Sequence, residues 1–352
     1  MEKNKEAIAL FWEASKKPAI QFSATPWETS PNYDKELQLP TLDMIRVACV
    51  IDFSCERMRR DGQMTQSLDE SCRLLDFSCR LASAEGACLV YFTHSLAINT
   101  IARGSIVRCV ELADNGALCV ETARKLGALE VPDTAMIAVV KSEYAIRDEI
   151  LREADLQKRM FDVSRYSFKI NQTRALLINM YREIIAAIIN DNMMEYKKRV
   201  TEADPSNGEN TLQKFKPNAI GEYGCAIMAP GFPSAYIRML ETRAKTRQAA
   251  CAFAIRAYWL EHGKIPPALD TLVPKYIKSV PEDPFTNKPM PYDPAKALLY
   301  CAGPERINDD GTYAFEDWDY QFNSRRFDNR PFMLLDWAAS APPKTPPQAA
   351  RE

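Results

Sequence analysis

Side chains that could perform acid–base chemistry are few in this sequence, and they are widely spaced along the chain. The acids Glu143, Glu111 and Asp114 fall on or beside segments with helical periodicity, where carboxylates from neighbouring helices can converge in a groove. Two carboxylates within about 10 Å of each other would suit hydrolysis of a glycosidic polymer. The alternative is that each acid faces solvent or pairs with a charge on a helix. A hydrolase is therefore one hypothesis, and it depends on whether these acids meet.

Sequence motifs for nucleophiles, metals and phosphates are missing. The chain contains no G-x-S-x-G, no H-E-x-x-H and no glycine-rich phosphate loop. Its two histidines are His94, inside an apolar helical segment, and His262, in the last turn of a predicted helix. We expect His262 to help satisfy the terminal carbonyls of that helix, and His94 to be a core or interface residue. No catalytic residue is assigned.

Ten cysteines raise the question of disulfides or a metal site. No two are arranged as C-x-x-C, and seven of the ten fall within apolar stripes of predicted helices. A cysteine in such a stripe behaves as a small buried hydrophobic residue. We therefore expect buried, reduced thiols, which favours a reducing compartment.

Composition and charge narrow the classes of partner. The chain of 352 residues is 46% hydrophobic and 26% charged, with a formal net charge of −2. Its basic clusters are short and interleaved with acids, so nucleic acid and anionic membrane surfaces are not expected as partners. No apolar run is long enough to span a bilayer, because Arg182 and Glu183 interrupt the most hydrophobic one, 175–189. Met1–Lys17 is charged and amphipathic, unlike a signal peptide, so an anchor would have to lie upstream.

Helices must position most of these acids, histidines and cysteines, because Pro132 is the only proline in residues 41–204. Apolar residues at alternating +4 and +3 spacing predict two helices joined as an antiparallel hairpin. The apolar positions are Met44, Ala48, Ile51, Cys55 and Met58 in the first helix and Leu68, Cys72, Leu75, Cys79 and Ala82 in the second. Further helices are expected at about 4–16, 87–113, 117–126, 133–158 and 171–201.

The expected fold class is mainly α with a small α+β tail. The predicted divisions are 1–40, a segment packed on the array; 41–204, an array of helical hairpins; 205–233, a linker or long ordered loop; 234–340, a long helix with an α+β domain; and 341–352, a disordered tail. Ser234 can cap the long helix, and Gly263 stops it. Fourteen of the 23 prolines lie from Pro266 onward, so only short strands fit there, with 297–301 and 332–337 as the best candidates.

Three motifs in the stretch 252–311 carry a family resemblance. They are Tyr-Trp-Leu-Glu-His-Gly-Lys-Ile-Pro at 258–266, Asp-Pro-Phe-Thr-Asn-Lys-Pro at 283–289 with Tyr292 after it, and Leu-Leu-Tyr-Cys-Ala-Gly-Pro at 298–304. This stretch resembles the soluble domain of the major pseudopilin of type II secretion systems. The part from about 39 to 204 resembles the helical region of uncharacterised proteins of planctomycete and verrucomicrobial type bacteria, in which a helical array precedes a pseudopilin-like tail. The resemblance implies a pseudopilin-like strand-and-turn unit after the long helix.

The resemblance also implies a calcium site. In the major pseudopilin an acidic loop binds calcium through aspartates and backbone carbonyls, and the matching positions here are Asp309, Asp310, Asp317 and Asp319. Calcium takes six to eight oxygen ligands, which carboxylates from the two ends of one loop and main-chain carbonyls can supply. The alternative is that Asp310-Gly311 is an ordinary turn with exposed acids. No other cofactor is expected.

The resemblance further implies association with the bacterial cell envelope, whereas the cysteine content favours the cytoplasm. A fibre-forming pseudopilin needs an apolar N-terminal half of the long helix, but here residues 238–247 carry five charges. Only the fold of the tail is therefore expected to be shared. The leading hypothesis is a non-enzymatic protein whose helical array presents a groove to a protein or peptide partner. The alternative is the hydrolase acting on an envelope polymer through acids in a helical groove.

Overall fold

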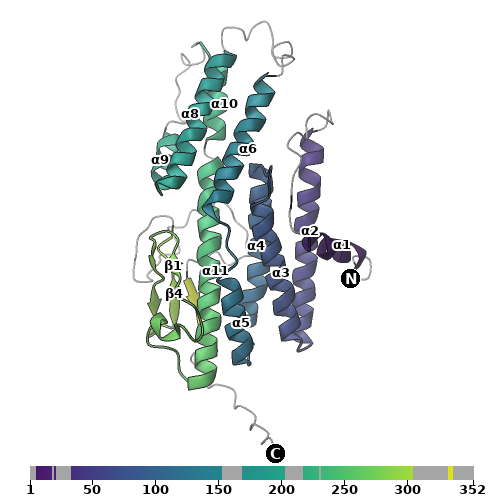
Figure 1. Cartoon of the computed structure of the whole chain (residues 1–352), viewed down its shortest axis with the longest axis vertical. Helices are drawn as coiled ribbons and strands as arrows, with labels where there is room; N and C mark the ends of the chain where they lie inside the picture. Colours follow the sequence, from purple (N-terminus) through teal and green to yellow (C-terminus); the bar gives the residue numbers. More distant parts are fainter. Residues whose placement is uncertain are drawn as a thin grey trace, which may run out of the picture.

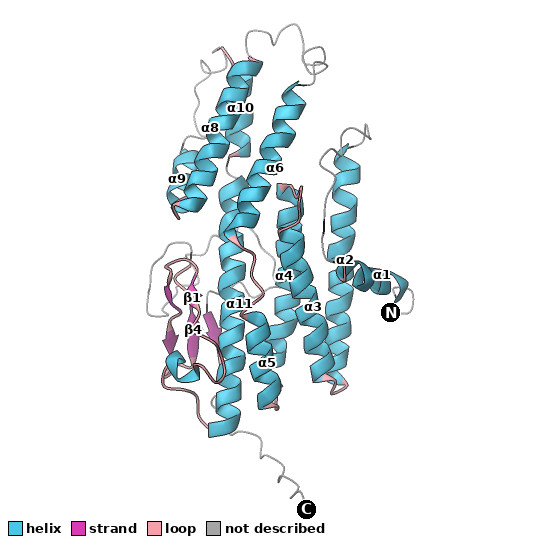
Figure 2. Cartoon of the chain, viewed as in Figure 1, coloured by secondary structure: helices cyan, strands magenta, loops and turns pink. Residues whose placement is uncertain are grey.

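The chain folds into an elongated helical bundle with a small strand unit on one side (Figure 1). The structure, a computed structural model, describes residues 5–17, 20, 33–152, 169–202, 217–229, 231–303 and 332–335. Helices dominate these residues, and a few short antiparallel strands lie in the C-terminal region (Figure 2). The predicted fold class, mainly α with a small α+β tail, is confirmed.

Three antiparallel helices form one side of the bundle: α2 (Tyr33–Arg60), α3 (Met64–Ala82) and α4 (Leu89–Val110). All the apolar positions predicted for the first hairpin are buried except Met44 and Met58, which are half-buried. The turn between α2 and α3 contains Gly62 at φ 76°, and the turn between α3 and α4 contains Gly86 at φ 75°. Glycine adopts this left-handed conformation without steric cost, so both turns reverse the chain tightly.

The first described helix, α1 (Lys5–Ser15), lies across this group of helices. Phe11 is buried against Phe77 of α3, with ring centroids 4.6 Å apart. The guanidinium of Arg73 lies 4.2 Å from the ring centroid of Trp12. Within the predicted N-terminal segment, 1–40, helix α1 thus packs on α3, and residues 18–19 and 21–32 lie outside the described residues.

Helix α2 begins earlier than predicted. It starts at Tyr33 and contains Pro40, whereas we expected an extended segment up to Pro40 and a helix from Thr41. A proline inside a helix removes one backbone hydrogen bond and bends the helix, but it does not always end it. Residues 35–39 (Lys-Glu-Leu-Gln-Leu) are strong helix formers, which accounts for a helix on both sides of the proline.

The upper part of the bundle consists of α6 (Asp133–Arg152), α8 (Ile170–Ile189), α9 (Met193–Glu202) and α10 (Ala219–Met228), and α5 (Gly116–Leu126) lies below it (Figure 1). The single helix predicted at 171–201 is two helices. Asp191 adopts φ 51°, and the Asn192 N–H donates to Ala187 O at 3.0 Å, as in a Schellman termination. The expected linker at 205–233 also differs, because α10 and the start of α11 lie within it.

Helix α11 (Gly231–His262) is the central element and packs against α4, α5 and α9. It ends as predicted, at Gly263 with φ 70°, whose N–H donates to Trp259 O at 2.8 Å. Two hydrophobic clusters form the interior. One combines residues between 11 and 126 with residues between 249 and 335, and the other combines 79–196 with 225–301. Each cluster therefore takes residues from both sides of the predicted linker, and the core does not divide there.

The strand unit packs on one side of α11. Strands β1 (Glu282–Asp283) and β2 (Lys288–Pro289) form a hairpin, and β3 (Tyr292–Asp293), β4 (Leu298–Tyr300) and β5 (Phe332–Leu334) form an antiparallel sheet in that order. The two strands predicted at 297–301 and 332–337 are thereby confirmed as β4 and β5.

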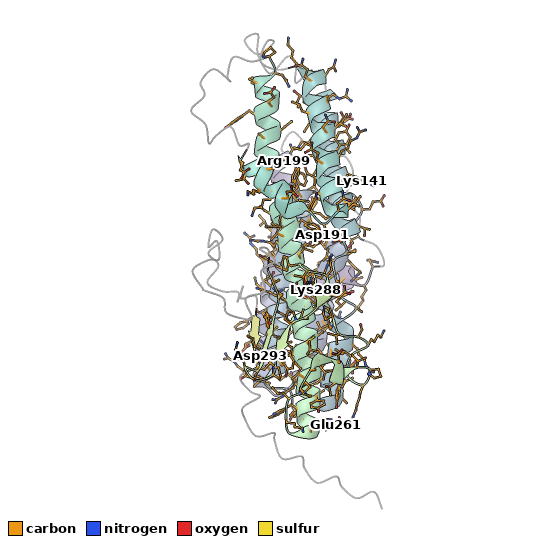
Figure 3. All side chains as sticks on the ribbon, turned by 90° about the vertical axis from the view of Figure 1, so that its left-hand side faces the viewer. Lys141, Asp191, Arg199, Glu261, Lys288 and Asp293 are labelled. Carbon is orange, nitrogen blue, oxygen red and sulfur yellow. The ribbon has the colours of Figure 1, made fainter. Side chains whose placement is uncertain are left out.

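The buried carboxylate of Asp283 organises the hairpin. It is fully buried, and it accepts hydrogen bonds from the backbone N–H groups of Phe285 at 2.9 Å and Ala302 at 2.7 Å. One side chain thus fixes both the turn after β1 and the end of β4. The hairpin also reaches the upper helices, because Asn287 Nδ2 donates to Asp191 Oδ2 at 3.3 Å; Asp191 lies above Lys288 along the long axis in Figure 3.

No helix in the described parts of the chain combines the length and the apolar character that crossing a membrane requires.

Candidate functional site

The four predicted calcium ligands, Asp309, Asp310, Asp317 and Asp319, lie outside the described residues. Among the residues that the structure describes, no group of three or more His, Cys, Asp and Glu side chains is placed to hold a metal ion. The calcium site therefore stays a prediction.

The acids proposed for a hydrolase do not converge. Glu143 of α6 is buried, and its Oε1 accepts a hydrogen bond from the Leu89 N–H at 2.8 Å. Leu89 is the first residue of α4, so the carboxylate caps that helix and lies at the positive end of its dipole. Glu111 follows the last residue of α4, and Asp114 is three residues further on; both are exposed. Because α4 has 22 residues, it separates Glu143 from these acids by roughly 33 Å.

His262 takes part in a side-chain cluster at the lower end of α11. Its ring contacts that of Tyr258, with centroids 4.2 Å apart and planes inclined at 45°, and its Nε2 lies 3.2 Å from the hydroxyl of Tyr276. The Tyr276 hydroxyl donates to Glu261 Oε2 at 2.6 Å, and Glu261 also pairs with Lys275. The sequence interpretation assigned His262 to capping the helix end and missed this contact, because Tyr276 arrives from a separate turn of the chain.

Two groups of this cluster, Tyr276 and Glu261, have shifted pKa values. Burial, followed by the hydrogen bond to Glu261, raises the pKa of Tyr276, so the phenol keeps its proton. The hydrogen bonds from Lys275 and Tyr276 lower the pKa of Glu261, which stays ionised. His94, the second histidine, is half-buried on α4, and burial lowers its pKa.

Nine of the ten cysteines are buried, and none forms a disulfide. Burial raises the thiol pKa to about 12 at Cys72, Cys79, Cys119 and Cys251. These thiols are protonated at neutral pH and are therefore poor nucleophiles and poor metal ligands. Buried, reduced cysteines were predicted, although Cys49 on α2 is exposed.

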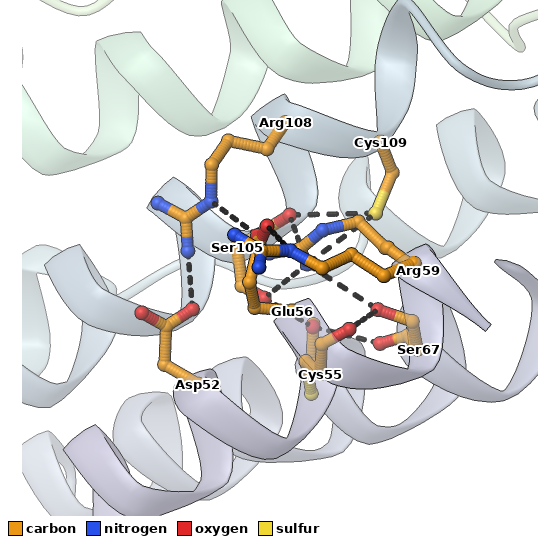
Figure 4. Close-up of polar contacts among 10 residues, drawn as sticks. Asp52, Cys55, Glu56, Arg59, Ser67, Ser105, Arg108 and Cys109 are labelled. Carbon is orange, nitrogen blue, oxygen red and sulfur yellow. Dashed lines mark hydrogen bonds and ion pairs between the residues drawn. The ribbon is translucent and has the colours of Figure 1, made fainter. Parts of the chain in front are cut away.

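A buried polar network joins α2, α3 and α4 around Arg59 (Figure 4). The Arg59 side chain is 2% exposed and pairs with Glu56. Its Nη1 donates to Ser105 Oγ at 2.9 Å and to Ser67 Oγ at 3.3 Å. Ser67 Oγ in turn donates to Cys55 O at 3.0 Å. The network satisfies the buried charge with groups from all three helices and so links these helices. We call it the Arg59 joint.

Part of this joint could have been found from the sequence. Arg59 lies four residues after Cys55 and eight after Ile51, which places it on the buried face of α2. The sequence interpretation counted Arg59, with Arg57 and Arg60, only as one of the short basic clusters that are interleaved with acids. The serine partners on the other helices had no such signal, because serines are ordinary in both buried and exposed positions.

An open hollow of about 650 Å³ lies beside α5. Its lining residues are Ala117, Val120, Glu121, Arg124, Lys125 and Lys275. Lys125 pairs with Glu121 at 2.8 Å and with Asp69 of α3 at 3.0 Å, while Lys275 pairs with Glu261. Carboxylates therefore pair with both lysines of the rim, and the third cation, Arg124, donates a hydrogen bond to Lys275 O at 2.8 Å.

The outer face of α2 exposes an apolar stripe. Phe53 is 64% exposed and Leu42 is 39% exposed, and Cys49 lies between them on the same face, at +7 and +4 spacing. Arg46 lies between Leu42 and Cys49, and Arg57 lies one turn beyond Phe53; they pair with Asp43 at 2.8 Å and with Asp61, the residue after α2, at 3.7 Å. We call these five residues the α2 stripe. A single exposed apolar residue is common, but several aligned on one helix face indicate a surface that can be covered.

Comparison of the chain with protein-family models, with curated proteins and with solved structures finds no match.

Proposed function

We propose that this protein binds another protein through the α2 stripe, the helical bundle serving as the rigid support for that surface. The exposure of Phe53 and Leu42 on one face of one helix carries the proposal. Burying a phenylalanine or leucine side chain contributes about 1.5–3 kcal/mol, so binding of a partner that covers these residues would be stabilised by their burial.

The composition of the stripe supports this function. Phenylalanine and arginine are enriched at protein interfaces, and aromatic residues and arginine dominate the binding energy of many complexes. The two arginines of the stripe, Arg46 and Arg57, would face acidic side chains of the partner. The stripe also lies on a long helix held by the Arg59 joint, so binding costs little ordering of the backbone.

The hydrolase alternative has less support. Glu143 is occupied in capping α4, and Glu111 and Asp114 lie at the opposite end of that helix. The pseudopilin-like character of the tail and the envelope location, with the cytoplasm as the alternative, stay predictions based on the sequence resemblance.

Site-specific photo-crosslinking in the native host tests the proposal. A benzophenone amino acid replaces Phe53 in one strain and Ile189 in another; Ile189 is a matched control, because it is 68% exposed and ends α8, on the other side of the bundle from α2 (Figure 1). We expect a discrete crosslinked product from position 53 and none from position 189. The substitution Arg57→Glu should weaken the position-53 product, because it reverses the charge at one end of the stripe. Equal products from both positions, or none from position 53, would refute the proposal.

A further inference from the structure

Two buried polar side chains of α4 face the interior one helical turn apart. Asn99 is 2% exposed and Arg103 is 6% exposed. Residues four apart lie on the same face of a helix. The neighbouring groups are Cys79 of α3, which contacts Asn99, and Thr242 of α11, which contacts Arg103.

Arg103 lacks a close counter-charge among the described residues. A guanidinium has five N–H donors, yet the hydrogen bond found for this one is a long contact of 3.4 Å from Nη1 to Thr242 O. That carbonyl also accepts from the Thr246 hydroxyl at 2.9 Å. Burial lowers the pKa of Arg103 to about 10. A buried charge with so little compensation is costly, so a further partner is expected.

Asn99 also has an unused polar atom. Its Nδ2 lies 3.6 Å from Cys79 Sγ, while its Oδ1 is buried without a hydrogen-bond partner. The amide oxygen is therefore available to a ligand that donates a hydrogen bond.

A carboxylate lies in the same region. Glu241 on α11 is half-buried, and burial raises its pKa even though Lys245, Arg238, Arg103 and Lys197 all act in the opposite direction. Arg238, Glu241 and Lys245 share one face of α11 at +3 and +4 spacing. Glu241 therefore interacts with three cations besides Arg103 and is not a dedicated partner of the Arg103 guanidinium.

We propose that Arg103 and Asn99 bind a small oxyanion that carries a proton, of the hydrogencarbonate or hydrogenphosphate class, between α4 and α11. The oxygens of such an anion accept hydrogen bonds from the guanidinium, and its O–H donates to Asn99 Oδ1. Oxyanions match the planar fork of an arginine. A water molecule could also donate to Asn99, but it would leave the charge of Arg103 uncompensated. This site is independent of the α2 stripe.

Thermal unfolding of the full chain tests the site. Melts are recorded at one pH and one ionic strength in sodium chloride alone, with sodium hydrogencarbonate, and with sodium phosphate. We expect one of the two oxyanions to raise Tm by about 3 °C at a hundredfold excess over its dissociation constant, with chloride as the reference. The oxyanion that gives the larger shift identifies the ligand.

Three variants make the result specific. Arg103→Met should abolish the shift because it removes the guanidinium. Asn99→Asp should abolish it while keeping or raising Tm in chloride, because a carboxylate one turn from Arg103 supplies the counter-charge. Arg108→Met is the matched control on the same helix; its guanidinium is 46% exposed and pairs with Asp52, so the shift should persist. A shift that survives in Arg103→Met and Asn99→Asp, or no shift with either oxyanion in the unmodified chain, would overturn the proposal.

Discussion

Arg59 of α2 donates a hydrogen bond to the hydroxyl of Ser105 on α4 at 2.9 Å, and the two residues are 46 positions apart in the sequence. The contact fixes α2 against α4, while Ser67 brings in α3. Because α2 carries the exposed stripe, the joint decides how rigidly the proposed binding surface is held.

We predict that Arg59→Met lowers the free energy of unfolding by about 3 kcal/mol. The substitution removes the guanidinium that donates hydrogen bonds to the buried hydroxyl groups of Ser67 and Ser105. Arg60→Met is the matched control, because Arg60 pairs with the same Glu56 but its side chain is 77% exposed. Arg60→Met should lower the free energy of unfolding by less than about 1 kcal/mol. Urea unfolding measures both, and similar costs would mean that the joint adds nothing beyond a surface ion pair.

The carboxylate of Asp283 provides a second prediction. Asp283→Ala should cost about 2–4 kcal/mol, because the buried N–H groups of Phe285 and Ala302 lose their acceptor. Asp293 in the next hairpin accepts from the N–H groups of Ala295 at 2.9 Å and Lys296 at 3.2 Å, but its side chain is 27% exposed. Water can replace it, so Asp293→Ala should cost less than about 1 kcal/mol. An equal loss of unfolding free energy in the two variants would contradict this account.

Two glycines of α10 should respond oppositely to the same substitution. A Cβ on Gly221 would lie 2.0 Å from Thr173 Oγ1 of α8, whereas a Cβ on Gly224 would meet nothing within 4 Å. Gly224→Ala should therefore stabilise the protein by about 0.5–1 kcal/mol through helix propensity. Gly221→Ala should destabilise it by more than that amount, because α8 and α10 must separate. Thermal melts of both variants, side by side, check the sign of each effect.

The buried thiols predict a loss of stability at alkaline pH. Burial raises the pKa of Cys251 from 9.0 to about 12, so the folded thiol keeps its proton while the unfolded thiol ionises. Its contribution is fully present below pH 9 and is lost as the pH rises toward 12. Each such thiol adds a slope of about −1.4 kcal/mol per pH unit above pH 9.

Unfolding in urea under reducing conditions between pH 8 and pH 11 measures this slope. Cys251→Ala should make the decline of the unfolding free energy with pH shallower by about 1.4 kcal/mol per pH unit, the slope that one proton contributes. Cys49→Ala is the control: Cys49 is exposed, and its removal should leave the slope unchanged. An unchanged slope in Cys251→Ala would show that other groups govern the alkaline transition.

The predicted calcium loop can be tested directly. Thermal melts in excess EGTA and in millimolar calcium should differ if Asp309, Asp310, Asp317 and Asp319 bind the ion, because a ligand bound only to the folded chain raises Tm. Asp317→Asn should remove the difference. Coinciding curves for the unmodified chain would mean that the acidic stretch is an ordinary turn.

The helices with strong periodicity could be predicted from the amino-acid sequence alone. The spacing from Met44 to Met58 and from Leu68 to Ala82 predicted the first hairpin, because a helix that buries one face needs apolar residues every three or four positions. Gly263 marked the end of α11, since few other residues adopt the required φ. The strands β4 and β5 were found because prolines leave little room for longer elements.

Other features depend on contacts between elements that are far apart in the sequence, and these local patterns do not contain that information. The division of 171–201 into α8 and α9 depends on Asp191 in a left-handed conformation, held partly by Asn287 far along the chain. The roles of Glu143 and Arg59 depend on Leu89 and Ser105, which other helices supply. Periodicity reports which face of an element is buried, whereas the partner of a buried polar group depends on how separate elements pack. The periodicity therefore located the buried faces of these helices, whereas the partners of Glu143 and Arg59 follow only from the packing of separate helices.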